Sequence, residues 1–403
     1  MKVLTVSASP YLLTRLGRMN NRIIRNLIDQ GHDVGAAVWH HDDTYFMPEE
    51  DGRFLFSESD GSTVCEMFPF DPHPEMSTPQ LYEVMKKYQP EIVISIGDYV
   101  ESDVVAAIKS MYPNLFKWVG VLTMGTHYVN PNWKDSLSYM DSAILTNERS
   151  LFSFLDLMGN EFPARYVPWG VDTSVFYPDG SPDPKGFLAL NASKNSQQSN
   201  LGAFVQGIKI CNIIDSCKTK GHIHTNVNDP GDLDLYNLFL MYGMEDTISV
   251  PQKFISINEG IPDDDLRKLY SSADVFIDCS VKSATAMSML EAMACGAIPL
   301  INYTGQLAVV ATLVGKGYHT VKGLSYIGEN EEELAIASPV RIAESLHKLH
   351  DMKENEPETY RGEREKSIEI AKCFLQEDFL MILNKIIRQT ANAKEHVLAV
   401  EDL

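Results

Sequence analysis

The side chains best suited to chemistry lie in residues 274–305, DVFIDCSVKSATAMSMLEAMACGAIPLINYTG. An apolar strand at 275–277 leads through a hydroxyl-rich turn into a helix that carries Glu291 beside its apolar stripe. A second strand at 298–301 delivers the loop at Gly305 to the same edge of the sheet. Backbone amides at two successive helix starts are therefore expected to face one anion, with a carboxylate close by. This arrangement predicts half of a nucleotide site.

Apolar strands alternate with helical patterns through the first 170 residues, which predicts βαβ units and a parallel sheet. Strands are expected at 2–7, 32–38, 91–96 and 117–122, and helices at 19–30, 80–88 and 102–111. The segment 40–77 is rich in Asp, Glu, Pro and Gly, so only irregular or edge-strand structure is predicted there. Each strand ends in a polar or glycine-bearing loop, where an open α/β sheet binds its ligands.

A change of composition at 176–185, FYPDGSPDPK, predicts a linker between two domains. Beyond it, strands are expected at 186–190 and 222–225, and helices at 201–214, 264–271, 339–350 and 363–388. With 403 residues, 44% of them hydrophobic, the chain is long and apolar enough for two cores. The predicted fold class is α/β, with two Rossmann-like domains facing each other across a cleft.

Charge and cysteine usage limit the partners and the compartment. The formal net charge of -21 disfavours nucleic acid and acidic membranes as long-range partners. Arg15, Arg18, Arg22 and Arg25 recur at helical spacing, which fits a solvated helix face or a local basic patch. The six cysteines show no CxxC spacing and are expected to be free thiols. No signal peptide or membrane span is recognisable, so a cytoplasmic protein is expected.

Three segments resemble the GT-B glycosyltransferases, and within them the retaining class of family 4, also called group 1. The strongest is SSADVFIDCSVKSATAMSMLEAMACGAIPLINYTGQ at 271–306, followed by YVPWGVDTSVFYPD at 166–179 and, more weakly, LTMGTHYVNP at 122–131. The resemblance covers nearly the whole chain. It implies the GT-B fold and transfer of a sugar, with retention, from a nucleotide diphosphate donor such as UDP-glucose. No cofactor or metal is implied.

The same resemblance implies a division of labour along the chain. Residues 1–175 would form the acceptor domain and 186–360 the nucleotide-sugar donor domain. The helix at 361–390 resembles the family's element that packs back on the first domain. The acceptor could be a carbohydrate, a small molecule or a nucleic acid.

The donor site implied by the resemblance centres on Glu291, which would accept both ribose hydroxyls. Ser283 and Thr285 would hold the distal phosphate, and Gly17 lies where the family has a glycine-rich turn facing the transferred sugar. The chain departs from the family at Ser283, where an acidic residue is usual. Ala284 and Ala286 replace the usual glycines, and the usual Arg and Lys clamp on the donor phosphates is missing.

A cation is still needed at the bond that breaks, because a doubly charged leaving group must be stabilised. Lys194 is the only cation in 191–200, NASKNSQQSN, and is predicted to supply it, with Arg165 as a fallback. The alternatives are structural: Glu291 as a cap or an internal ion pair, Ser283 and Thr285 as simple caps, and Lys194 as a surface lysine.

His127 is the catalytic candidate of the first domain, together with Lys194 of the second. It follows a buried strand, and by resemblance it would orient the transferred sugar or the acceptor, although a lone histidine is commonly structural. Asp98, Tyr99 and Arg18 are candidates for acceptor binding. A further cluster of potential metal ligands consists of His40, His41, Asp42 and Asp43. Adjacent side chains in a loop rarely converge on one ion, so no metal site is predicted.

Three alternative functions remain open at this stage. A nucleotide-sugar epimerase shares the architecture but should show further acid and base residues in the cleft. A catalytically weakened GT-B module that only binds nucleotides would explain Ser283. A DNA-modifying glycosyltransferase acting on modified bases would use the arginines at 15, 18, 22 and 25 on its nucleic acid.

Overall fold

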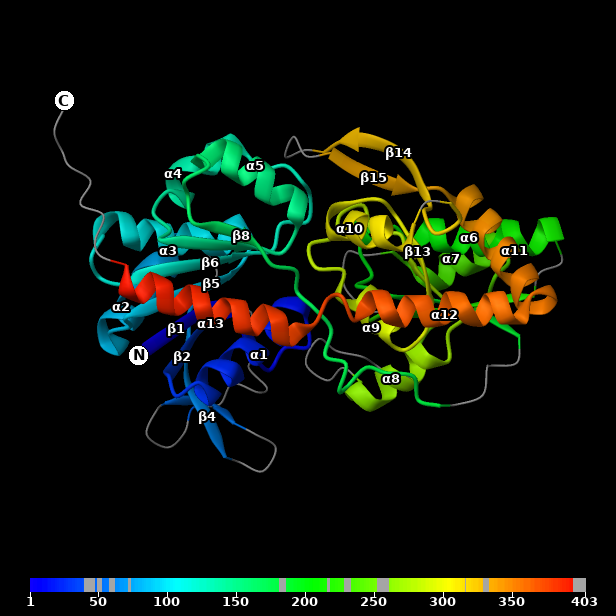
Figure 1. The fold of residues 1–403 in the computed structure, drawn as a ribbon. Helices are drawn as coiled ribbons and strands as arrows, with labels where there is room; N and C mark the ends of the chain where they lie inside the picture. Colours follow the sequence, from blue (N-terminus) through cyan, green and yellow to red (C-terminus); the bar gives the residue numbers. More distant parts are fainter. Residues whose placement is uncertain are drawn as a thin grey trace.

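The computed structural model describes residues 1–39, 48, 53–57, 62–71, 74–180, 186–215, 218–227, 233–251, 261–315, 317–328 and 333–393. Two sheets, one on each side of an interdomain boundary, organise these residues (Figure 1). The first sheet has eight strands in the order β3-β4-β2-β1-β5-β6-β7-β8, and the second has five in the order β11-β10-β9-β12-β13. All neighbouring strands run parallel except β3 and β4.

Helices cover both faces of the first sheet. Its strands are β1 (Lys2–Ala8), β2 (Asp33–Trp39), β3 (Phe54–Ser57), β4 (Thr63–Pro69), β5 (Ile92–Gly97), β6 (Lys117–Leu122), β7 (Ser142–Leu145) and β8 (Ala164–Tyr166). Its helices are α1 (Arg15–Asp29), α2 (Pro74–Tyr88), α3 (Tyr99–Met111), α4 (Lys134–Leu137) and α5 (Glu148–Met158), with a 3-10 turn, η1, at Pro131–Trp133. Val3 packs with the core under α1, and Leu4 packs with the opposite core under α2 and α3. Both faces of β1 are therefore buried, as is typical of a central strand in a parallel sheet.

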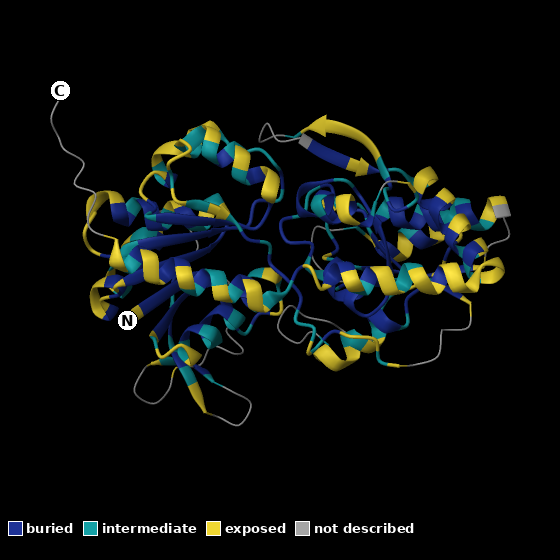
Figure 2. Ribbon diagram, in the orientation of Figure 1, coloured by how far each residue is buried: buried dark blue, intermediate teal, exposed yellow. Residues whose placement is uncertain are grey.

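The second sheet is built in the same way. Its strands are β9 (Phe187–Ala192), β10 (Thr219–His224), β11 (Ile248–Ser249), β12 (Val275–Asp278) and β13 (Ile298–Ile301). Its helices are α6 (Leu201–Asp215), α7 (Leu235–Tyr242), α8 (Asp263–Ser271), α9 (Met287–Ala294), α10 (Gly305–Val314), α11 (Pro339–Asn355) and α12 (Pro357–Ala371), with a 3-10 turn, η2, at Gln197–Ser199. A hairpin of β14 (Lys322–Ile327) and β15 (Glu333–Ala337) stands apart from the sheet. Figure 2 shows the central strands of both sheets buried, whereas β14 is largely exposed.

The chain crosses between the two domains twice, and the two crossings lie together. Val171 donates its N–H to the carbonyl oxygen of Phe374 at 2.8 Å, and Gln376 donates back to Val171 at 3.1 Å. A Cβ on Gly170 would lie 2.5 Å from the carbonyl oxygen of Phe374, so only glycine lets the two crossings touch. The C-terminal segment expected as a helix that packs back on the first domain is consequently two helices. α12 packs on α9 and α10, and α13 (Gln376–Asn392) packs on α1, β6 and β7 of the first domain (Figure 1).

Other differences from the expected elements are local. The edge strand expected within 40–77 is β3, and β4 beside it is a full parallel strand. α1 begins at Arg15 and not at residue 19, because the Thr14 side chain accepts the N–H of Gly17 and caps the helix. No helix among the residues described is long and apolar enough to cross a membrane.

Gly362 offers a direct test of the packing of α12. It lies exposed within the helix, and a Cβ built on it would meet nothing within 4 Å. Gly362→Ala is therefore expected to raise the free energy of unfolding by about 0.5–1 kcal/mol, because alanine loses less backbone entropy on folding. Urea denaturation of both proteins measures the change. A lower stability would mean that another chain or segment covers this face of α12.

Candidate functional site

The loops that follow the parallel strands of the two sheets meet at the boundary between the domains. Ser283, in the loop after β12, donates its N–H to the carbonyl oxygen of Gly125, in the loop after β6, at 3.0 Å. The Thr146 hydroxyl, after β7, donates to the carbonyl oxygen of Ala284 at 3.0 Å. Ligands of open α/β sheets bind at these carboxyl ends, so the boundary is the candidate site.

Glu291 is the charged centre of this boundary. It lies in the second turn of α9 and is only 3% exposed. Its Oε1 accepts from Arg18 Nη2 at 2.8 Å, and its Oε2 accepts from the Tyr270 hydroxyl at 3.2 Å. Burial raises the pKa of Glu291, and Arg18 opposes that shift. A carboxylate has about four lone-pair positions, so two remain after these bonds, enough for the two hydroxyls of a ribose.

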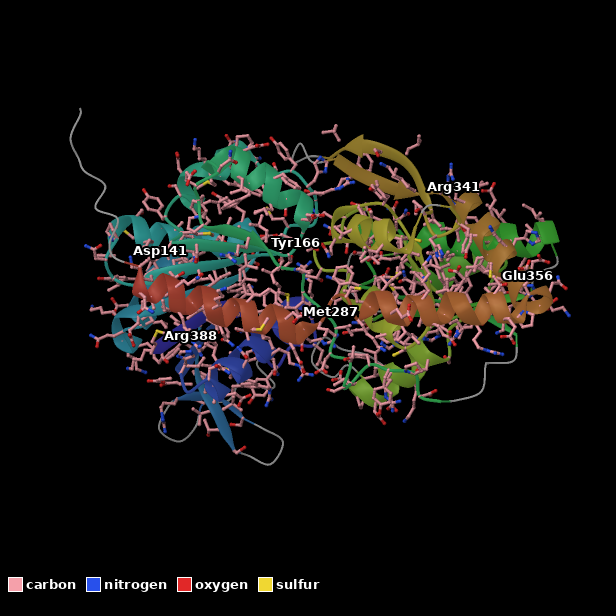
Figure 3. All side chains as sticks on the ribbon, in the orientation of Figure 1. Asp141, Tyr166, Met287, Arg341, Glu356 and Arg388 are labelled. Carbon is pink, nitrogen blue, oxygen red and sulfur yellow. The ribbon has the colours of Figure 1, made fainter. Side chains whose placement is uncertain are left out.

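A cavity of about 340 Å³ opens beside Glu291 and is lined by both domains. The first domain contributes Arg18 and Leu12, the crossing segment contributes Trp169, and the second domain contributes Asp263 and Met287. Figure 3 shows Met287 where the two domains meet. The cavity is therefore polar on the side of Glu291 and has the interdomain location typical of ligand sites.

The start of α9 forms one wall of the site. Ala286 has φ of +52°, in the left-handed region that favours glycine, and turns the chain directly into the helix at Met287. Thr285 precedes it and is 2% exposed. The first amides of α9 lie one turn from Glu291, and the free amides at a helix start are a general binding site for anions.

The second helix start does not contribute in the expected way. Gln306, in the first turn of α10, donates its N–H to the carbonyl oxygen of Ser283 at 2.9 Å. The expectation that both helix starts face one anion is therefore wrong at Gln306, because a protein carbonyl already occupies that amide. Gly305 has φ of +46° and lies tightly between the carbonyl oxygens of Ser283 and Gly125.

Gly17 and Lys194 differ in how closely they approach this site. Gly17 lies in the first turn of α1 and not in the loop before it, and a Cβ there would lie 2.7 Å from the carbonyl oxygen of Ser9. It lets α1 pack on the preceding loop, next to Arg18. Lys194 is exposed in the loop after β9 and is not among the residues that line the cavity. Arg165, the fallback cation, is exposed in β8.

The candidates of the first domain have clear local roles. His127 is half-buried in the loop after β6, two residues from Gly125. Asp98 caps α3 by accepting from Val100 N at 3.0 Å, and the Tyr99 hydroxyl donates to Asp103 Oδ1 at 2.9 Å. Tyr99 also stacks on Trp133 with ring centroids 4.6 Å apart. Asp98 and Tyr99 therefore stabilise the start of α3 and are not among the residues that line the cavity, and an acceptor role for them stays a prediction.

The structure also shows polar contacts between the domains that sequence patterns do not reveal. Gln306 Nε2 donates to the Tyr166 hydroxyl at 2.9 Å, and Arg149 Nη2 donates to the Tyr303 hydroxyl at 2.8 Å. Burial raises the pKa of Tyr166 to about 12. Figure 3 shows Tyr166 at the junction of the two domains. These contacts hold the domains together on the side of β7 and β8.

A metal ion has no obvious position in the described part of the chain. Among those residues, no group of three or more His, Cys, Asp or Glu side chains is arranged to hold one. The cluster of potential ligands at His40, His41, Asp42 and Asp43 lies outside the described residues.

Comparisons with known proteins agree with this architecture. Sucrose-phosphate synthase from Thermosynechococcus elongatus is similar over 96% of this chain and 98% of its own, at 14% identity and a TM-score of 0.72. HepE from Anabaena, solved in complex with UDP-glucose, is similar over 96% of this chain and 100% of its own, at 12% identity and a TM-score of 0.68. A comparison with curated proteins gave no match. Residues 252–355, which include α9 and Glu291, match the family model described as Glycosyl transferases group 1. The chain therefore has the GT-B fold, and residues 252–355 of its second domain are similar to the Glycosyl transferases group 1 model.

Proposed function

We propose that the protein is a retaining hexosyltransferase that moves a sugar from a UDP-sugar, such as UDP-glucose, to an acceptor. Buried Glu291 carries the proposal. It lies at the edge of an interdomain cavity, and its carboxylate has two lone-pair positions left to accept hydrogen bonds from a ribose. The group 1 match over residues 252–355, within the second domain, supports a sugar nucleotide as donor. HepE from Anabaena, which has the same fold, was solved with UDP-glucose, and this supports UDP as the nucleotide of the proposed donor. The proposed location is the cytoplasm.

The proposed reaction assigns a task to each part of the site. Glu291 accepts the ribose hydroxyls, and the first turn of α9 with Thr285 and Ser283 holds the phosphates. The bond between the anomeric carbon and the diphosphate oxygen breaks, and the acceptor oxygen bonds to the same face of that carbon. The acceptor proton passes to the departing phosphate, so no separate base is needed. His127 and the loop around Gly17, from residues 1–175, orient the transferred sugar against the acceptor.

The test is incubation with UDP-glucose and detection of released UDP. Slow release without an acceptor is expected, because water can replace the acceptor at the anomeric carbon. Proton NMR of the released glucose at early times should show the α anomer first, as retention requires. Tight UDP binding together with release of the β anomer of glucose would contradict the retaining mechanism but not the transferase assignment. Absence of any binding or turnover with UDP-, GDP- and ADP-sugars would contradict the transferase assignment.

A module that binds a nucleotide without turnover is the second candidate. Ser283 provides no carboxylate for the sugar hydroxyls. Its backbone N–H donates a hydrogen bond to the carbonyl oxygen of Gly125 in the other domain. UDP binding without UDP release, across a panel of carbohydrate and small-molecule acceptors, would favour it. A nucleic acid acceptor would be marked by an affinity that collapses between low and moderate salt.

A further inference from the structure

Arg18 connects the first domain to the heart of the donor site. It lies in the first turn of α1, and its side chain is 26% exposed. Its Nη2 donates to Glu291 Oε1 at 2.8 Å and lies 3.9 Å from Asp263 Oδ1. Its Nη1 lies 3.5 Å from the Met287 sulfur. One guanidinium thus reaches α8 and two residues of α9, Met287 at its start and Glu291 one turn later.

This position is where the phosphates of a bound donor must pass. Met287 and Glu291 are four residues apart on one face of α9, about 5–6 Å along the helix. The Glu291 side chain leans toward the helix start, over the turn that begins at Met287. A nucleoside diphosphate with its ribose on Glu291 therefore carries its phosphates to the first amides of α9. Arg18 spans that same turn.

Arg18 also has the chemistry for this role. A guanidinium has five N–H donors, of which the bonds described above use only some. Burial opposes its charge, but Glu291 outweighs burial and raises the pKa of Arg18. It therefore stays cationic in a site whose other charged wall residues in the second domain, Asp263 and Glu291, are acidic. Lys194 has no comparable position, because it is exposed and outside the cavity lining.

We propose that Arg18, supplied by the first domain, binds and neutralises the diphosphate of the donor, in the role that the sequence suggests for Lys194. The inference rests on the proposed function. It also couples the two domains: the diphosphate then bridges α1 and α9, so donor binding holds the domains closed.

The test compares uridine with UDP, because only UDP carries the phosphates. Both ligands are titrated calorimetrically into the full-length wild type and into Arg18→Gln, Arg18→Lys, Lys194→Gln and Arg388→Gln. Arg388 is a matched control, since it donates from α13 to Gln30, the residue after α1, at 3.0 Å and does not line the cavity beside Glu291. Circular dichroism confirms that each variant is folded, and Arg18→Lys keeps the charge if the glutamine variant unfolds.

The expected result is a loss of UDP affinity of about 10- to 100-fold in Arg18→Gln, with uridine changed by less than about threefold. Arg18→Lys should recover part of the loss, and Lys194→Gln and Arg388→Gln should match the wild type. An equal loss for uridine and UDP would overturn the inference, because Arg18 would then act only by holding Glu291. A selective UDP loss in Lys194→Gln alone would also overturn it. If the wild type bound neither ligand nor any other nucleotide, the proposed function itself would fail.

Discussion

Glu291→Ala is expected to weaken UDP binding about 100-fold or more. The substitution removes the carboxylate, and with it two proposed hydrogen bonds from the ribose hydroxyls. Each is worth about 1.5–3 kcal/mol of binding free energy because the carboxylate is charged. The substitution also removes the partner of Arg18, bonded at 2.8 Å, and of the buried Tyr270 hydroxyl. Breaking a buried pair from one side costs about 3–5 kcal/mol of stability, so the variant should unfold at a lower temperature than the wild type.

A comparison of UDP with 2′-deoxy-UDP separates ribose binding from stability. The wild type should prefer UDP by about tenfold or more, since one hydroxyl is missing from the deoxy ligand. Glu291→Ala should bind both ligands equally, and the better-folded Glu291→Gln should lie between. Asp264→Asn is the matched control, because it removes an exposed carboxylate that pairs with Arg267 on α8. An alanine variant that still prefers UDP would remove Glu291 from the ribose site.

Local sequence patterns predict two α/β domains with parallel sheets, and the resemblance of residues 271–306 and 166–179 to the GT-B glycosyltransferases implies the GT-B arrangement of them. Buried parallel strands read as short apolar runs, and β12 with α9 follows such a run through a turn to a helix. The same local logic places Glu291 inside α9 and the helix start at the sheet edge. Both features depend on residues within about one strand–turn–helix unit, and that is the range over which sequence periodicity is informative.

Features set by contacts between distant segments are not predictable in this way. The break between α12 and α13 contains no proline or glycine, since residues 372–375 read KCFL. It is fixed by the pairing of Val171 with Leu375 and by the close approach at Gly170. Sequence periodicity favours one continuous segment there, because the segment that pairs with it lies about 200 residues away along the chain.

The same limit applies to the site. Arg18 reads as one of several regularly spaced arginines, and the sequence suggests an acceptor role for it. Its pairing with Glu291, 273 residues further on, depends on how the two domains meet. The capping residue Thr14 was the one local signal that could have placed Arg18 in the first turn of α1. Conversely, Lys194 stands out in the sequence only because its neighbourhood has no other cation.

Gly305→Ala is expected to lower turnover about 100-fold. Gly305 has φ of +46°, which costs an L-residue about 1–2 kcal/mol, and its Cβ would overlap the carbonyl oxygens of Ser283 and Gly125. Relieving that overlap costs about another 1–3 kcal/mol and must displace the Ser283 loop. Two bonds at the domain boundary would be lost, from Ser283 N to Gly125 and from Gln306 N to Ser283. The loops of the two domains would then no longer be held together at Ser283 and Gly125, so groups from the two domains would be misplaced relative to each other.

Gly125→Ala is the matched control at the same junction. The atoms nearest to a Cβ on Gly125 belong to the Lys282 side chain and lie 3.4 Å away, which is an ordinary van der Waals contact and not a clash. Steady-state release of UDP from UDP-glucose should therefore change by less than about threefold in Gly125→Ala while it collapses in Gly305→Ala. Retained UDP affinity in Gly305→Ala would place the defect in domain closure, because Glu291 and the first turn of α9 would still bind the nucleotide. Normal turnover in Gly305→Ala would show that the reaction proceeds without the Ser283–Gly125 contact, in a more open arrangement of the two domains.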